Sequence, residues 1–73
     1  MIKLRVEEVA KQRGISMRKL SRTAGIAYNT LRTIYRNPYR RITTDTLEKL
    51  AKALNVPAAE LIEDVPDKES PNP

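Results

Sequence analysis

The sequence predicts an all-α fold, a single compact domain of five short helices over residues 1–63. Its length of 73 residues accommodates one domain at most. Apolar residues recur at helical spacing in several short segments, and Gly, Asn or Pro separates each segment from the next. Residues 64–73 contain three of the five Pro, several charges and no apolar periodicity, so we expect them to form a disordered polar tail.

The first residues predict a short extended arm followed by a helix. Ile2, Leu4 and Val6 alternate with basic residues, which favours an extended start. The first helix then runs to about Arg13 and ends at Gly14, a residue suited to helix termination.

Residues 16–36 predict two short helices joined by a tight turn. Ser16 is a favourable N-cap for a helix over Met17 to Thr23, and Gly25 supplies the left-handed residue that a helix C-terminus often needs. Ile26 fills the corner, and a third helix follows over about residues 27–36. This pattern is typical of a helix-turn-helix, whose second helix lies in the major groove of DNA.

The third helix separates its side chains into two faces at about 100° per residue. Its apolar face carries Ala27, Leu31, Ile34 and Tyr35. Its polar face carries Tyr28, Asn29, Arg32, Thr33 and Arg36. An ordinary solvated face usually mixes Glu with Lys, whereas no acidic residue occurs between positions 13 and 42. The pattern therefore favours a nucleic-acid face over a plain solvated one.

The fourth helix follows a loop over residues 37–41, where Pro38 prevents simple continuation of the preceding helix. Thr43 is its expected N-cap, and Asn55 is expected to end it in the left-handed conformation. Its apolar positions have the spacing i, i+3, i+4, i+7, at Leu47, Leu50, Ala51 and Leu54. A short fifth helix is expected from Pro57, at its first position, to about Ile62.

Charge is distributed unevenly along the chain. The net charge is +5, but residues 1–41 hold eleven Lys or Arg and two Glu, a net charge of +9. Residues 42–73 hold three Lys and seven acidic residues, a net charge of −4. A basic region that coincides with the helix-turn-helix is expected of a protein that binds the phosphate backbone. Membrane-surface binding is the competing explanation, but it favours Trp, Phe or Leu on a helix face opposite the basic residues. The chain has no Trp or Phe, and its apolar positions are needed for the core.

The composition argues against several other classes of protein. The chain has no Cys and no His, so it lacks a disulfide framework, a thiolate metal site and the usual general base. Glu7 and Glu8 are adjacent and diverge on a helix, so they form no catalytic pair. We therefore expect no enzyme activity, no metal and no cofactor. With no long apolar run and no signal segment, we expect a cytoplasmic protein that associates with the bacterial nucleoid when it binds DNA.

Two segments of the chain together resemble the Cro/C1 type of helix-turn-helix, also called the XRE family. The first includes Ser16, Leu20-Ser21 and Gly25-Ile26, and the second is the Leu-x-x-Leu-Ala-x-x-Leu-x-Val pattern from Leu47 to Val56. The resemblance covers residues 1–63 and implies a lambda-repressor-like fold. It further implies sequence-specific binding of double-stranded DNA by a transcriptional regulator, most simply a repressor.

The resemblance and the side-chain chemistry together suggest candidate DNA contacts. The residues expected to contact base edges are Tyr28, Asn29, Thr30, Arg32 and Thr33. The residues expected to contact phosphates are Ser16, Met17, Arg18, Arg36, Arg40, Arg41 and Thr43. Three positions depart from the family pattern. Met17 replaces a common Gln, Ala27 replaces the usual Ser or Thr cap, and residues 36–39 replace a Glu-x-Gly element.

Two alternatives remain open at the level of the sequence. One is a protein-interaction module of the same fold, such as the partner-binding domain of an antitoxin, which would expose Leu, Met or Trp where this helix has Arg, Asn and Thr. The other is an engineered DNA binder on this scaffold. We expect a monomer or weak homodimer, with two copies pairing on DNA if at all.

Overall fold

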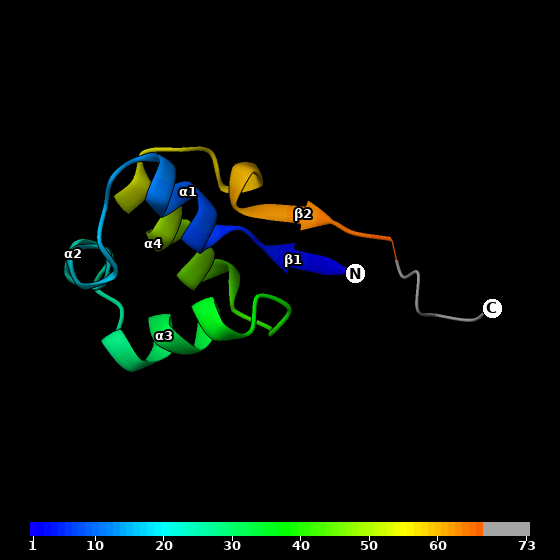
Figure 1. The fold of residues 1–73 in the computed structure, drawn as a ribbon, viewed down its shortest axis with the longest axis horizontal. Helices are drawn as coiled ribbons and strands as arrows, with labels where there is room; N and C mark the ends of the chain where they lie inside the picture. Colours follow the sequence, from blue (N-terminus) through cyan, green and yellow to red (C-terminus); the bar gives the residue numbers. More distant parts are fainter. Residues whose placement is uncertain (67–73) are drawn as a thin grey trace.

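Four α-helices and a small antiparallel sheet make up the fold in the computed structural model, which describes residues 1–66 (Figure 1). The helices lie together at one end, and the two strands project from the other end beside the N-terminus. The elements in chain order are β1 (Ile2–Leu4), α1 (Val6–Gln12), α2 (Met17–Ala24), α3 (Tyr28–Arg36), α4 (Thr44–Leu54), the 3-10 turn η1 (Ala58–Leu61) and β2 (Ile62–Asp64).

The expectation of five helices in an all-α fold was wrong at the C-terminal end. The expected fifth helix is the single 3-10 turn η1, and Pro57 lies before this turn rather than inside it. The turn stops because the backbone becomes extended at Ile62, with φ −129° and ψ 152°. The carbonyl of Leu61 accepts a hydrogen bond of 2.7 Å from the N–H of Arg5, which directs the chain along the N-terminal strand.

The expected extended arm is a strand with a partner distant in sequence. β1 pairs antiparallel with β2 in the register Ile2↔Asp64, Lys3↔Glu63 and Leu4↔Ile62. The N–H of Val65 continues this pairing by donating to the carbonyl of Met1 at 2.8 Å. Asp64 and Val65 therefore belong with the sheet and not with the expected tail, whose residues 67–73 lie outside the described part of the chain.

The core is formed by apolar residues from every helix and from both ends of the described chain. It contains no buried polar or charged residue within residues 1–66. Its members are Leu4, Val6, Val9, Ala10, Leu20, Ala24, Leu31, Ile34, Leu50, Ala51, Leu54 and Leu61. The helical spacing of Leu50, Ala51 and Leu54 predicted their burial correctly, while Leu47 and Val56 are half-buried at the core's edge.

Local signals in the sequence set most helix ends as expected. Ser16 Oγ accepts a hydrogen bond of 3.1 Å from the N–H of Lys19 and so caps α2, and Thr43 Oγ1 caps α4 by accepting from the N–H of Thr46 at 3.1 Å. Gly25 and Asn55 end α2 and α4 in the left-handed conformation, with φ of 70° and 59°. These caps satisfy backbone groups that the helix itself leaves unpaired.

Candidate nucleic-acid interface

The turn between α2 and α3 is held by two hydrogen bonds between Ser21 and Ile26. The N–H of Ile26 donates to the carbonyl of Ser21 at 3.1 Å, and the hydroxyl of Ser21 donates to the carbonyl of Ile26 at 2.5 Å. Because these bonds join the last turn of α2 to Ile26, two residues before the start of α3, they constrain the angle between the helices. The role of this hydroxyl is not evident from the sequence, where the only signal for it is its position four residues before Gly25.

The α3 helix has one buried and one exposed face. Leu31 and Ile34 are buried in the core. All the candidate base-contacting residues are exposed: Tyr28, Asn29, Arg32 and Thr33 lie on the other face, and Thr30 lies at its edge. Arg36 is exposed one turn further along. In Figure 1, α3 lies along one outer edge of the helical cluster, so this polar face lies on the surface of the molecule.

The N-terminus of α3 has no side-chain cap. Ala27 precedes the helix and accepts no hydrogen bond through its side chain, and the first turn contains no acidic residue. Its N–H groups are therefore not paired with a capping oxygen, and the helix dipole places partial positive charge at this end. An acceptor group such as a phosphate or a base edge suits this position.

The candidate phosphate-contacting residues flank α3 in sequence. Ser16 and Arg18 are exposed at the start of α2. Met17 is only half-exposed, because its side chain packs against the core, which leaves the backbone N–H of this residue as its polar group near the surface. Arg40, Arg41 and Thr43 are exposed between α3 and α4.

The basic loop after α3 has a defined conformation. Asn37 Oδ1 accepts a hydrogen bond of 3.3 Å from the N–H of Tyr39, and the carbonyl of Asn37 accepts from the N–H of Arg40 at 3.1 Å. The carbonyl of Pro38 accepts from the N–H of Leu4 in β1 at 2.6 Å. These bonds fix the loop that carries Arg40 and Arg41. The contributions of Asn37 and β1 to this loop are not evident from the sequence.

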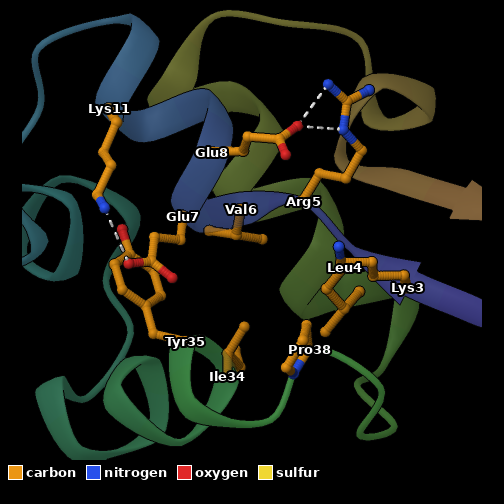
Figure 2. Close-up of a pocket in the computed structure, with 10 residues that line it drawn as sticks. All are labelled: Lys3, Leu4, Arg5, Val6, Glu7, Glu8, Lys11, Ile34, Tyr35 and Pro38. Atoms are coloured by element: carbon orange, nitrogen blue, oxygen red, sulfur yellow. Dashed lines mark hydrogen bonds and ion pairs between the residues drawn. The ribbon is translucent and has the colours of Figure 1, made fainter.

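A cavity of about 330 Å³ lies between β1, α1 and the C-terminal half of α3 (Figure 2). Arg5 and Glu8 form an ion pair at 2.7 Å beside it, and Lys11 pairs with Glu7 at 3.3 Å. Tyr35 is half-buried here, as expected of a residue at the edge of the core. Burial, and then the negative charge of Glu7, raise the pKa of Tyr35, so this phenol stays protonated at neutral pH.

Exposed cationic and amide side chains lie on α3 and on the segments beside it. Within residues 1–66, no group of three or more Asp or Glu side chains is placed to hold a metal ion. None of the helices in this same range has the length and apolar character needed to cross a membrane.

A short helix, a left-handed glycine turn and a second helix with an exposed polar face define a helix-turn-helix domain. The profile of one family, the Cro/C1-type helix-turn-helix DNA-binding domain, matches residues 5–67, and the chain belongs to this family. The resemblance found in the sequence is thereby confirmed.

A solved structure supports the same assignment at the level of the fold. The chain is similar to the N-terminal DNA-binding domain of SinR, the master biofilm regulator of Bacillus subtilis, whose structure was determined in solution. The two share 28% sequence identity with a TM-score of 0.67, over 93% of this chain and 94% of the SinR domain. The comparison with curated proteins gave no match.

Proposed function

We propose that this protein binds specific double-stranded DNA sequences by placing α3 in the major groove, and that it represses transcription by occupying its sites. The exposed face of α3 carries the proposal, because it combines amide, guanidinium and hydroxyl groups. These groups form hydrogen bonds with base edges, and the absence of acidic residues from 13 to 42 avoids repulsion of phosphates.

The base contacts follow from the chemistry of two side chains. Asn29 can pair through two hydrogen bonds with N6 and N7 of adenine, and Arg32 with O6 and N7 of guanine. Within residues 1–66, neither side chain is engaged in a hydrogen bond or an ion pair. Tyr28 and Thr30 at the start of the helix complete the surface that would face the groove.

The phosphate contacts would hold the protein in register on the duplex. Ser16 and Arg18 at the N-terminus of α2 would bind one strand, with the N–H of Met17. Arg40, Arg41 and Thr43 would bind from the other side of α3, together with Arg36. Repression is the simplest outcome of such binding, because a bound domain blocks other proteins from the same DNA. The similarity to the DNA-binding domain of a regulator supports the DNA-binding part of the proposal.

Selection of bound duplexes from a random DNA library tests the proposal. We expect a defined sequence motif, and an affinity for the selected duplex that falls linearly with salt on logarithmic axes. The expected slope is about −0.9 for each phosphate neutralised. If no duplex binds even at low salt, the proposal is wrong. If all duplexes bind equally, the protein binds DNA without sequence specificity, which contradicts the role assigned to α3.

A further inference from the structure

Thr33 differs from the other polar residues on the exposed face of α3 in how its side chain is used. Its hydroxyl donates a hydrogen bond of 2.9 Å to the carbonyl of Asn29, one turn earlier in the same helix. Asn29, Thr30 and Arg32, by contrast, make no side-chain hydrogen bond within residues 1–66. Thr33 is nevertheless exposed on the same face of the helix.

This hydrogen bond limits what the side chain of Thr33 can offer to another molecule. The Cβ atom of threonine carries a hydroxyl and a methyl group, and here the hydroxyl is directed back to the helix backbone. A hydroxyl has a single proton to donate, and the carbonyl of Asn29 takes it. The hydroxyl oxygen keeps lone pairs that can accept a hydrogen bond, and the methyl group is the apolar substituent that Thr33 offers to a molecule placed against this face.

We propose that Thr33 specifies thymine, through contact between its methyl group and the C5-methyl group of the base. Thymine is the base that presents a methyl group in the major groove, where the other bases present only donors, acceptors or hydrogen. The inference rests on the proposed function, since it requires α3 to lie in the major groove. It assigns Thr33 an apolar role, in contrast to the hydrogen-bonding roles of Asn29 and Arg32.

The experiment uses the full chain and the duplex obtained by selection. Each thymine of the bound site is replaced in turn by deoxyuridine, which lacks only the methyl group, and affinity is measured by fluorescence anisotropy. We expect one thymine under each bound copy of the protein at which this replacement lowers the affinity of the wild-type protein about fourfold, the effect of losing the burial of one methyl-sized group.

Variants at Thr33 identify the protein group that contacts this methyl. Thr33→Val keeps a methyl group and removes the hydroxyl, so it should retain the deoxyuridine penalty. Thr33→Ser keeps the hydroxyl and removes the methyl, so it should bind the thymine and deoxyuridine duplexes equally. Thr23→Ser removes a methyl from an exposed threonine of α2, outside the proposed contacts, and should retain the full penalty. Circular dichroism confirms that each variant is folded.

The possible results separate this inference from the proposed function. If Thr33→Ser keeps the deoxyuridine penalty, the role assigned to Thr33 is wrong. If the wild-type protein shows no penalty at any thymine, that role is also wrong. In both cases sequence-specific binding stands. If Thr33→Val loses affinity for the selected duplex and Thr33→Ser does not, the hydroxyl makes the contact. This result would also overturn the role assigned to the methyl group. Failure of the wild-type protein to bind any duplex instead overturns the proposed function.

Discussion

At the scale of single residues, Asn29 and Arg32 on α3 differ from Arg41 in what they can distinguish. The first two can form paired hydrogen bonds with one base, whereas Arg41 lies in the loop beside the helix and would contact phosphate, which is the same at every position. We expect Asn29→Ala and Arg32→Ala each to cost about 1–3 kcal/mol on the selected site and to relax the preference at one base pair.

Arg41→Ala serves as the matched comparison for these two variants. It should weaken binding to all sequences alike and make the salt slope shallower by about one unit. Affinities for the selected duplex and for its single-base variants, each measured at several salt concentrations, check both expectations. An equal loss on every duplex for all three variants would mean that α3 positions the protein without selecting the sequence.

Tyr35 carries a hydroxyl that is buried and has no hydrogen-bond partner in the described part of the chain. Such a group costs free energy in the folded state, so Tyr35→Phe should raise the free energy of unfolding by about 1 kcal/mol. Because the pKa of Tyr35 is raised on folding, the wild-type protein should also lose stability as the pH rises above about 10, and the variant should lose less.

Thermal unfolding of both proteins at pH 7 and across the alkaline range measures these effects. Lysines titrate in the same range in both proteins, so only the difference between the two curves reports on Tyr35. A variant that is less stable at pH 7 would show that the hydroxyl contributes a favourable interaction.

More of the chemistry of the candidate site than of its geometry could be predicted from the sequence. Helical spacing placed Asn29, Arg32 and Thr33 on one face, because the period of a helix is fixed. The hydrogen bonds of Ser21 and Asn37 were missed, because a hydroxyl or amide has many possible local partners. Which partner it takes depends on the backbone conformation of the turn or loop.

At the scale of elements, the start of α3 is weaker than those of α2 and α4. Ser16 and Thr43 cap their helices through side-chain oxygens, and Ala27 does not. Ala27 has φ −56° and ψ 139°, close to the φ −72° and ψ 159° of Ser16, so a serine there would be placed to cap. We expect Ala27→Ser to stabilise the protein by about 1 kcal/mol, measured by denaturant unfolding.

The reverse substitution at a site that already has a cap is the control for Ala27→Ser. Thr43→Ala should lose a similar amount, because it removes the hydrogen bond accepted from the N–H of Thr46. If Ala27→Ser leaves stability unchanged while Thr43→Ala lowers it, the start of α3 lacks the geometry that a cap requires.

Helix ends were predicted well because caps are local, whereas the sheet was missed because its pairing is not. Gly25 and Asn55 lie next to the helices that they end. Leu4 and Ile62, in contrast, pair across almost the whole described chain. Strands of three residues give too short an alternation to identify alone, and Pro57 favoured a helix start at the place where only one 3-10 turn forms.

At the scale of the whole molecule, the sheet joins the two ends of the described chain and also supports the loop beside α3. β1 pairs with β2 and donates to the carbonyl of Pro38. A chain ended after Leu61 loses the β1–β2 pairing and the packing of Ile62, so its melting temperature should fall by several degrees.

A chain ended after Pro66 is the matched control for the shorter one. It keeps the strand pairing and the hydrogen bond from the N–H of Val65 to the carbonyl of Met1, and should therefore melt close to the full chain. Equal melting temperatures for the two truncated chains would show that the sheet adds little to stability.

The surface of residues 1–66 also bears on assembly. Its exposed large apolar side chains are Met1, Ile2, Tyr28 and Tyr39. Tyr28 belongs to the proposed DNA-binding face, and Tyr39 lies in the loop that follows α3. A stable protein–protein interface buries about 800 Å² on each partner, with an apolar centre, and four scattered side chains do not form one. We therefore expect a monomer at micromolar concentration.

Two copies would pair only on duplexes whose half-sites lie about 34–36 Å apart, so that both α3 helices face the same side of the DNA. Sedimentation velocity of the free protein, and of its complexes with half-sites at that spacing and at a spacing half a turn longer, tests the expectation. A stable dimer without DNA would contradict it and would direct attention to Ile2 on β1. Equal pairing at both spacings would show that the two copies bind without contact.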